Sequence, residues 1–390
     1  MYPEYIDKII ARLEAAGERA YIVGGSLRDA LLGITPHDYD VTTSALPQVT
    51  ARIFSDMRVI ETGIKHGTVT VIFDGEPVEI TTFRIDGSYT DSRHPDGVTF
   101  TSDIVADLAR RDFTVNAMAY NKREGLVDPF GGAEDARRGI IRAVGVPQDR
   151  FCEDALRIMR AFRFSAQLGF EIEEKTLAGM SAAASGLENI ARERIGNEFI
   201  RLITSPHPRA ALELMAATDT LKYALGEYSP PRLVIENIEA IPRCDVARLG
   251  FLLCGLDRDS AEPILKGLRC SGKQITGALA VLTGSKETVS SAADARRLIS
   301  KTGIYATYAA AASYLSGNSP SEAESITARE ASAPCRLQDL KINGKVLSQM
   351  GVRGKLIGEI LARLMDAVIA DPSLNEESTL VSLAERMIGE

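Results

Sequence analysis

The chain has 390 residues, more than one compact core holds, so roughly two to four domains are expected. Apolar residues make up 45% and charged residues 25%, which excludes a disordered or collagen-like chain. With 45 Lys and Arg against 53 Asp and Glu the net charge is −8, which excludes a protein that coats nucleic acid through bulk charge, so any nucleic-acid site must be a local patch.

The composition also bears on location. No apolar stretch approaches the roughly 20 residues of a membrane span, and the first residues lack the basic and apolar segments of a secretory signal. The five cysteines are scattered and never form a Cys-x-x-Cys pair, which favours reduced thiols and argues against a zinc site. We expect a cytoplasmic protein with no membrane partner.

Up to about residue 145 the chain alternates helical and strand patterns. A helix is expected from Tyr5 to Leu13, and Ser26 is the expected N-cap of a second helix over 27–32. Strands are expected at 20–23, 41–43, 68–73 and 78–83, the last two forming a hairpin. Residues 85–103 are expected to form a long loop.

From about residue 150 amphipathic helices replace the strands. The predicted fold class is therefore α+β, a mixed sheet with helices followed by an all-α region. The expected division is a head at 1–145, a helical neck at 146–210, a helical body at 211–335 and a helical tail at 336–390.

Three carboxylates suggest metal chemistry in the head. Asp38 and Asp40 lie two residues apart at the start of a strand, so both can point to one side and hold Mg²⁺ with substrate phosphates. Glu79 has apolar neighbours in its strand and would be an unusual acid to bury without a cation. Solvated acids at a strand start and at a sheet edge are the alternatives.

A glycine turn precedes these carboxylates. Gly24 and Gly25 separate a strand from a helix, an arrangement that exposes backbone N–H groups to an anion, and Arg28 can add a charged contact to a phosphate. With the three carboxylates, this cradle is typical of two-metal phosphoryl transfer.

Residues 23–33 (VGGSLRDALLG) and 38–43 (DYDVTT) resemble the opening of class II tRNA nucleotidyltransferases, the CCA-adding enzymes. The similarity continues, in the family's order, through 110–119 (RRDFTVNAMA), 128–132 (DPFGG), the Arg150-Phe151-x-Glu153-Asp154-x-x-Arg157 motif and Glu193 to Glu198. The resemblance implies a nucleotidyltransferase head. It also implies that Arg111 contacts phosphate and that Asp112 and Asn116 lie near the sugar. Without it, these three could be surface charges at a helix start.

A basic segment follows the head. Seven arginines and three acids lie between residues 137 and 163. We expect one helix from Glu153 to carry Asp154, Arg157, Arg160 and Arg163 along one side. The alternative is a solvated helix face with an Asp154–Arg157 ion pair of little energetic value.

Asp154 and Arg157 suggest how a base could be chosen. Cytosine and adenine both present an amino donor beside a ring-nitrogen acceptor, whereas uracil and guanine present a carbonyl beside an N–H. A carboxylate beside a guanidinium therefore fits C and A and leaves U and G with unmatched polar groups. The family's proposed protein template is the corresponding Asp and Arg.

We therefore expect template-independent addition of C, C and A to the tRNA 3′ end from CTP and ATP. Asp38 and Asp40 would hold Mg²⁺ with help from Glu79, while Gly25, Arg28 and Arg111 would hold the triphosphate. Arg160 and Arg163 would shape the nucleotide pocket. By resemblance, the loop from Arg84 to Phe100, with Tyr89, Arg93 and His94, serves the switch to A addition. Basic residues of the tail would hold the tRNA: Lys341, Lys345, Arg353 and Lys355.

Several rivals remain open at this stage. A poly(A) polymerase should carry more basic surface, and an enzyme adding only CC or only A would share the same chemistry. A nucleotide-sensing regulator would have no need of three intact carboxylates. Some relatives carry a phosphohydrolase domain that needs His-Asp pairs, and no histidine follows His207, so no such domain is expected.

Overall fold

The computed structural model describes residues 2–36, 38–87, 97–313 and 320–389, and it divides into two compact units. One comprises residues 1–202 with 210–224, and the other residues 203–209 with 225–390. Within the described residues, every helix is too short or too polar to cross a bilayer. The four-part division expected from the sequence remains a prediction.

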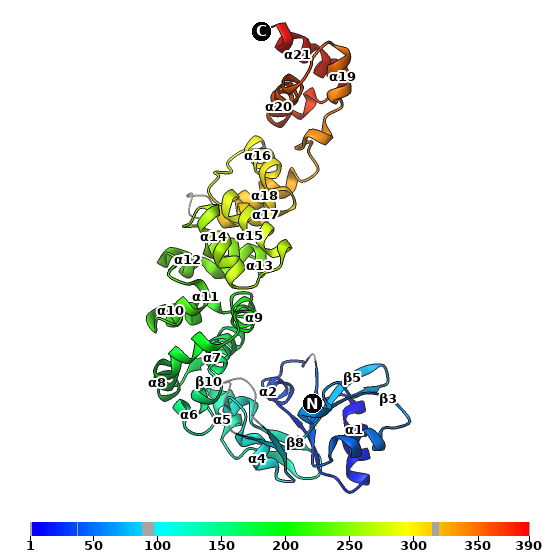
Figure 1. Cartoon of the computed structure of the whole chain (residues 1–390), viewed down its shortest axis with the longest axis vertical. Helices are drawn as coiled ribbons and strands as arrows, with labels where there is room; N and C mark the ends of the chain where they lie inside the picture. The colour runs from blue at the N-terminus through cyan, green and yellow to red at the C-terminus, as the bar shows by residue number, and fades with distance from the viewer. Residues whose placement is uncertain (1, 37, 88–96, 314–319, 390) are drawn as a thin grey trace. The chain divides into compact units, whose positions relative to one another are not determined.

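A seven-stranded mixed sheet organises the N-terminal part of the first unit (Figure 1). Its strand order is β3-β4-β5-β2-β1-β8-β9. The strands are β1 (Ala20–Val23), β2 (Asp40–Thr43), β3 (Arg58–Ile60), β4 (Thr68–Phe73), β5 (Glu76–Thr82), β8 (Ala119–Asn121) and β9 (Gly125–Val127). The expected hairpin is confirmed as β4–β5, and Asp74 and Gly75 make its turn with φ of 52° and 90°.

The central strand β1 is buried at every residue, whereas β4 and β5 are fully buried on one face only. The helix α1 (Glu4–Ala15) presents Ile6, Ile9 and Leu13 to a cluster that includes Ile22 of β1. Tyr21 and Val23 point to the opposite face, where they join a second cluster with α4 (Ile104–Ala109). This alternation fixes which residues of each strand remain available to a site.

Two local expectations for the head are corrected. The helix α2 begins at Gly25, so Ser26 lies inside it and its hydroxyl donates to the Val23 carbonyl instead of capping. The expected loop contains the antiparallel pair β6 (Arg84–Asp86) and β7 (Val98–Phe100). Tyr89, Arg93 and His94 lie outside the described residues.

The expected helix from Glu153 is wrong in one respect that matters for the site. The helix α6 (Pro147–Glu153) ends before Asp154, and α7 (Leu156–Leu168) begins after it. Asp154 is extended, with φ −142° and ψ 101°, because its carboxylate accepts the Leu156 N–H at 3.0 Å in competition with the helix. Arg157, Arg160 and Arg163 do share α7.

Further elements complete the first unit. A short parallel pair joins β10 (Ile140–Ile141) to β11 (Glu171–Ile172), and β11 lies in the region expected to be almost entirely helical. The helices are α3 (Pro47–Ile53), α5 (Gly132–Arg138), α8 (Glu174–Ala183), α9 (Arg192–Ile203), α10 (Pro208–Ala217) and α11 (Lys222–Leu225). Some of these run past the boundary between the two units.

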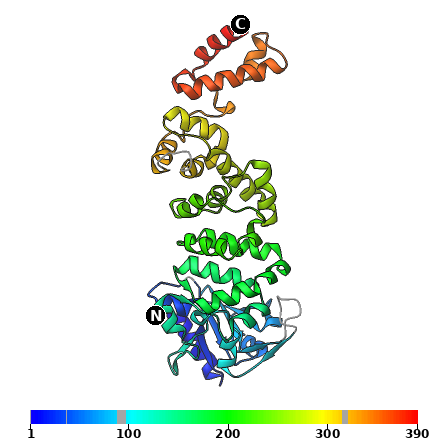
Figure 2. The same ribbon diagram turned by 90° about the vertical axis from the view of Figure 1, so that its left-hand side faces the viewer.

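The second unit is helical in the part of the chain that the structure describes (Figure 2). Its helices are α12 (Arg232–Asn237), α13 (Asp245–Leu252), α14 (Arg258–Gly267), α15 (Gly272–Gly284), α16 (Ala292–Thr302), α17 (Ala306–Ala311), α18 (Pro320–Arg329), α19 (Gly344–Gln349), α20 (Lys355–Ala370) and α21 (Glu377–Gly389). Residues between Val289 and Cys335 form one apolar cluster, and residues between Leu340 and Ala384 form another.

Candidate active site

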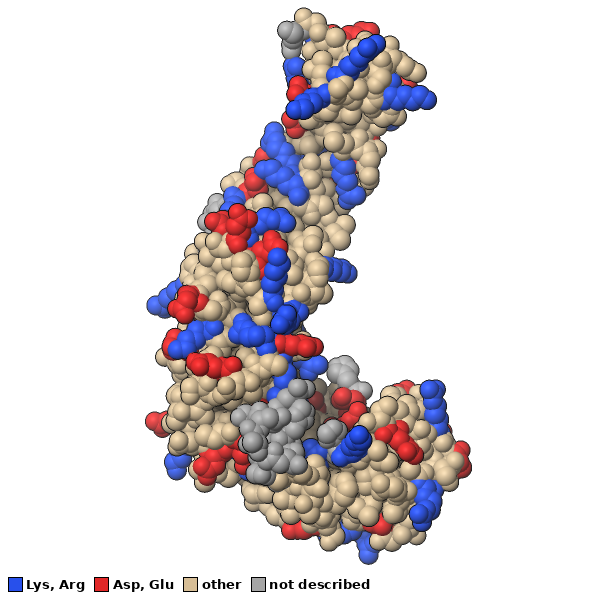
Figure 3. All heavy atoms as spheres, viewed as in Figure 1, with Lys and Arg blue, Asp and Glu red and all other residues tan. Residues whose placement is uncertain are grey.

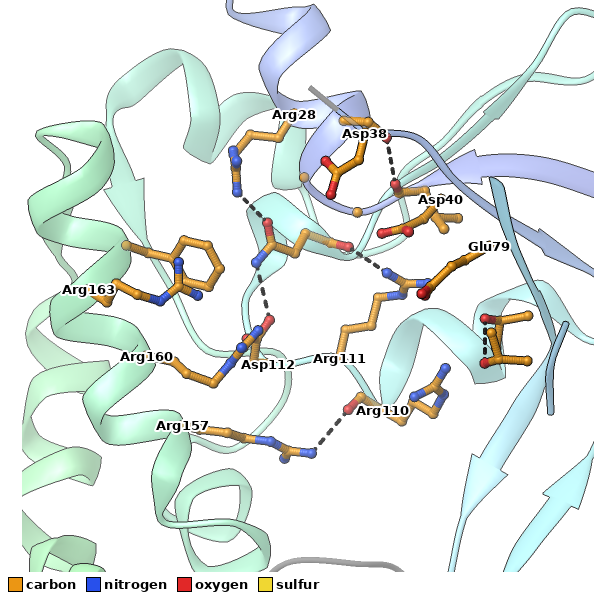
Figure 4. Close-up of a pocket in the computed structure, with 18 of the residues that line it drawn as sticks. Arg28, Asp38, Asp40, Glu79, Arg110, Arg111, Asp112, Arg157, Arg160 and Arg163 are labelled. Atoms are coloured by element: carbon orange, nitrogen blue, oxygen red, sulfur yellow. Dashed lines mark hydrogen bonds and ion pairs between the residues drawn. The ribbon is translucent and has the colours of Figure 1, made fainter. Parts of the chain in front are cut away.

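A cleft of about 960 Å³ in the first unit brings together every residue predicted from the sequence to be catalytic or to bind the nucleotide. Its lining includes Gly25, Arg28, Asp38, Asp40, Glu79, Arg111, Asp112, Asn116, Asp154, Arg157, Arg160 and Arg163. Figure 4 shows the three carboxylates Asp38, Asp40 and Glu79 on one side and the arginines of α7 on the other. The two sides thus differ in charge.

Strand pairing brings the carboxylates together. The strands β2 and β5 run parallel, with Asp40 directly opposite Glu79, and Asp38 precedes Asp40 by two residues. Burial raises the pKa of Asp40 to about 6, and repulsion from Asp38 and Glu79 adds to this effect, although the residue still meets solvent in the cleft. A cation would relieve this repulsion, so the carboxylates fit a metal ion.

The carboxylates do not make a complete metal cage by themselves. Among the described residues, no three His, Cys, Asp or Glu side chains are arranged to surround a metal ion. Mg²⁺ is usually held by one or two carboxylates, with water and substrate phosphates as its other ligands. The arrangement therefore suits a metal that binds together with a phosphate-bearing substrate.

The turn at Gly24 brings the backbone close to these groups. Gly24 has φ 74°, a conformation that favours glycine. A Cβ atom there would lie 3.3 Å from Arg111 Nη1 and 3.7 Å from Asp40 Oδ2. Its backbone conformation therefore favours glycine, and a side chain there would also crowd Arg111.

Arg111 is held beside the carboxylates with donor capacity to spare. Its Nη2 lies 3.4 Å from the buried Asp107, and its Nη1 lies 3.5 Å from the Asn116 carbonyl. No described residue accepts a hydrogen bond from its buried Nε. Burial lowers the pKa of Arg111, against the attraction of Asp107 and Asp40. A bound anion in the cleft would supply the missing acceptor.

A chain of hydrogen bonds crosses the floor of the cleft (Figure 4). Arg28 is nearly buried; its Nη1 donates to Asn116 Oδ1 at 2.8 Å and its other nitrogens bind Asp29. Asn116 Nδ2 donates to Asp112 Oδ1 at 3.2 Å, and Arg160 binds Asp112 Oδ2 at 2.7 Å. Burial opposes ionisation of Asp112, but Arg160 and Asn116 outweigh it and leave the pKa below its ordinary value.

The template candidates Asp154 and Arg157 are each anchored by their own partners and are not paired with one another through their side chains. Asp154 Oδ2 accepts from Arg194 Nη2 at 3.1 Å. Arg157 donates to Glu153 at 2.6 Å, to the Arg150 carbonyl at 3.1 Å and to the Arg110 carbonyl at 3.3 Å. Arg157 is 8% exposed, so the alternative of a solvated helix face is wrong for this residue.

Three arginines surround one aromatic ring at the end of the cleft. The guanidinium carbons of Arg163, Arg160 and Arg28 lie 4.0, 5.3 and 5.5 Å from the centre of the Phe164 ring. Arg163 also binds Glu198 at 2.5 Å. Cation–π attraction to the ring, together with the Glu198 carboxylate, offsets the repulsion among these three arginines.

Several lining residues were not among the predicted site residues: Arg84, Arg110, Phe164, Gln167, Arg194 and Arg201. Phe164 and Gln167 could have been found from the sequence, because they continue the spacing of three to four residues along α7. Arg84 and Arg201 belong to no such pattern. The basic segment is less uniform than its composition indicated. Arg137 pairs with Glu134, and Arg142 binds Asp135 at 2.9 Å.

Three family models match successive parts of the chain. The poly A polymerase head domain matches residues 20–142, and the probable RNA and SrmB-binding site of polymerase A matches residues 169–230. A putative domain 2 of tRNA nucleotidyltransferase matches residues 248–384. Together they cover most of the chain.

Individual relatives agree with these models. A CCA-adding enzyme of Limosilactobacillus fermentum is 36% identical, covering 97% of this chain and 96% of its own length. The crystal structure of the Bacillus stearothermophilus CCA-adding enzyme with CTP superposes with a TM-score of 0.82 at 32% identity, covering 100% of this chain and 99% of the other. The Thermotoga maritima CCA-adding enzyme, solved with tRNA_CCA, shares the fold at a TM-score of 0.72 and 22% identity, covering 98% of this chain and 94% of its own. The expected α+β fold is confirmed, and the chain belongs to the family of CCA-adding enzymes.

Proposed function

We propose that the cleft transfers CMP, CMP and AMP in turn from CTP and ATP to the 3′ end of tRNA and releases pyrophosphate. The observation that carries this proposal is the convergence of all the predicted site residues on one cleft with a carboxylate side and an arginine side. Full-length similarity to CCA-adding enzymes supports the same conclusion.

The carboxylate side would receive the tRNA 3′-OH and the α-phosphate. Asp38 and Asp40 are the proposed ligands of Mg²⁺, and Glu79 helps orient them because it lies opposite Asp40 in the sheet. When bound, the metal stabilises charge on the attacking and leaving oxygens. Burial is the main cause of the raised pKa of Asp40, and repulsion from Asp38 and Glu79 adds to it, so a bound cation would favour the ionised carboxylate.

Arg111 is the proposed principal ligand of the triphosphate. It has a buried donor without a described partner and lies beside both Gly24 and the carboxylates. Arg28 contributes less directly because Asp29 and Asn116 already occupy three of its five N–H donors, so we assign it to holding Asn116. Gly25 leaves room for the Arg28 guanidinium, since a Cβ at this position would lie 3.3 Å from Arg28 Nη2.

Asp112 is the proposed acceptor for a ribose hydroxyl. Arg160 and Asn116 keep it ionised and fix its orientation, and a carboxylate has lone pairs beyond those they occupy. Asp154 and Arg157 are the proposed readers of the base edge. Their anchors, Arg194 and Glu153, fix the two side chains before the nucleotide arrives.

The direct test is an extension assay with tRNAs that lack CCA, CA or A, supplied with Mg²⁺ and with CTP and ATP singly and together. We expect a ladder that ends at CCA. A ladder that ends after CC, or that adds only the final A, would identify a partial enzyme, and one that never ends would identify a poly(A) polymerase. Absence of any product with retained nucleotide binding would favour a sensing role.

Phe164 offers a test of how the arginine side is held. In Phe164→Leu the stacking of three guanidiniums is lost, at about 0.5–2 kcal/mol for each contact. We expect the KM for CTP and ATP to rise by about tenfold or more, with a smaller change in kcat. Phe164→Tyr retains the ring and should remain close to wild type in steady-state assays.

Phe162→Leu is the matched control for this prediction. Phe162 lies on the same helix but is fully buried in the core and does not line the cleft. We expect it to lower Tm while leaving the KM values near wild type. Equal KM changes in the Phe164 and Phe162 variants would show that loosened packing, not guanidinium stacking, is responsible.

Two expectations remain as predictions. The segment proposed to switch the enzyme to A addition includes Tyr89, Arg93 and His94, which lie outside the described residues. The tail lysines and arginines are proposed to bind tRNA phosphates, and Lys341, Lys345, Arg353 and Lys355 are all exposed. A cytoplasmic location is consistent with this substrate.

A further inference from the structure

Arg296 lies where the two apolar clusters of the second unit meet. It belongs to α16, whose neighbours Ala295 and Leu298 are in the cluster between Val289 and Cys335. The helix α20 supplies Val368 and Ile369 to the other cluster, between Leu340 and Ala384. The two clusters share no residue, and α16 packs on α20. The polar contacts between α16 and α20 therefore affect how firmly the helices α19 to α21 are held in place.

The Arg296 guanidinium makes three contacts across this junction. Its Nε donates to the Ile369 carbonyl at 2.6 Å and its Nη2 to the Ala370 carbonyl at 3.1 Å. Its Nη1 donates to Glu330 at 2.7 Å. Ile369 and Ala370 end α20, where carbonyls lack helical partners and the helix dipole is negative, so a buried cation is favoured there.

This arrangement is stronger than an ordinary surface ion pair. Arg296 is only 7% exposed, whereas its neighbour Arg297 makes an exposed pair with Asp294. Removing the Arg296 charge would leave the buried Ile369 carbonyl, the part-buried Ala370 carbonyl and Glu330 without this donor, and an unsatisfied buried group is costly. The contact is directional because a planar guanidinium requires acceptors at fixed angles.

The segment that Arg296 holds at the end of α20 also carries a basic surface, which is formed by residues 336–363. Residues 336–363 include six Lys or Arg and two acids, and Figure 3 shows Lys and Arg side chains on the surface of the segment that contains α19, α20 and α21. Phosphate contacts can position an RNA only if the side chains that make them are themselves fixed. Flexible attachment would reduce the number of contacts that form together.

We propose that Arg296 is a positioning residue that clamps the end of α20 and so fixes the basic surface of residues 336–363 for binding tRNA outside its 3′ end. This inference rests on the proposed function. It assigns to Arg296 no contact with RNA, nucleotide or metal. Its role is to fix the positions of the phosphate-binding side chains, so that they can contact the RNA simultaneously.

The test compares Arg296→Met with Arg297→Met on two RNAs, a tRNA lacking its final A and a single-stranded oligonucleotide ending in CC. In Arg296→Met we expect the KM for tRNA to rise about tenfold, with the KM for ATP and for the oligonucleotide unchanged. The slope of log KM for tRNA against log salt should fall by about one to two, because fewer phosphates are neutralised. Arg297→Met should match wild type in every measurement.

Three outcomes would overturn the inference: an unchanged KM for tRNA, equal losses on both RNAs, or an unchanged salt slope. Arg296→Lys keeps the charge but not the planar fork, so it should recover part of the tRNA affinity and supplies the test if the Met variant folds poorly. If the wild-type enzyme extends neither of the two RNAs, the result would instead refute the proposed function.

Discussion

Asp40→Asn is expected to reduce nucleotide incorporation by about 10³-fold or more while leaving the fold intact. The variant removes a proposed metal-binding charge; a bound metal would stabilise the transition state by several kcal/mol, and each 1.36 kcal/mol corresponds to about tenfold in rate. Binding of CTP and ATP should persist because Arg111, Asp112 and α7 are unchanged. Primer-extension rates and equilibrium nucleotide binding, measured on the same preparation, check both statements.

The same substitution should raise Tm when divalent metal is removed with EDTA. The folded-state pKa of Asp40, about 6, is above its ordinary value of 3.8, so the folded protein binds more protons than the unfolded chain between these values. The free energy of unfolding therefore falls as pH rises from about 4 to about 6 and stays lower above that range. Asn carries no charge, so the gain in Tm should be greatest above pH 6 and should vanish near pH 4.

Two comparisons make this result specific. Mg²⁺ should raise the Tm of wild type above pH 6, because a ligand that binds the folded state stabilises it, and should raise that of Asp40→Asn much less. Asp56→Asn makes the same chemical change at an exposed pair with Arg12 in the same sheet-bearing region, and no gain in Tm is expected there. Retained incorporation by Asp40→Asn would refute the metal assignment.

Local patterns were enough to name the candidate carboxylates and the glycine turn, whereas the roles of Arg111, Asp112 and Asn116 followed from the family resemblance. Asp38 and Asp40 needed only the two-residue period of a strand, and the Gly24-Gly25 turn needed only its position between a strand and a helix. Glu79 was a weaker prediction, since its apolar neighbours suggested a buried acid, whereas it is exposed and lines the cleft. Its alignment opposite Asp40 depends on the parallel pairing of β2 with β5, strands almost 40 residues apart, and no local pattern specifies that register.

The errors arose where a side chain competes with the backbone or where partners are distant. Asp154 follows a helical spacing, yet its carboxylate accepts the Leu156 N–H and separates α6 from α7. The Arg194 contact to Asp154 spans 40 residues, and the ring of Phe164 gathers arginines from α2 and α7. Such contacts exist only after folding, so a motif can name the residues without giving their orientation.

The break at Asp154 leads to a sharper expectation for base selection. If Asp154 and Arg157 lay on one continuous helix, the helix would fix their positions relative to each other. Here Asp154 is oriented by Arg194 and Leu156, and Arg157 is oriented by Glu153 and two carbonyls. Each residue can therefore be changed while the anchors of the other remain in place, and the two halves of the proposed base contact can be tested separately.

The double variant Asp154→Ala, Arg157→Ala is expected to accept UTP and GTP. A site built to hydrogen-bond its substrate can reject a mismatched one by about 10⁴–10⁵, whereas apolar shape alone provides only about 10². Discrimination between CTP and UTP should therefore fall from the first range toward the second, while incorporation of CTP remains measurable because the carboxylate side is intact. The kcat/KM for each nucleotide, on a tRNA that lacks CCA, measures this ratio.

The single variants divide the effect and exclude a general loss of packing. Arg157→Lys keeps the charge but loses the planar fork, so it should weaken rejection of UTP by less than Arg157→Ala does. Arg137→Ala removes an exposed arginine from the same basic segment and should leave selectivity unchanged. If the double variant still rejects UTP and GTP as wild type does, the base is read by other groups, and Arg194 and Gln167 in the same cleft become the next candidates.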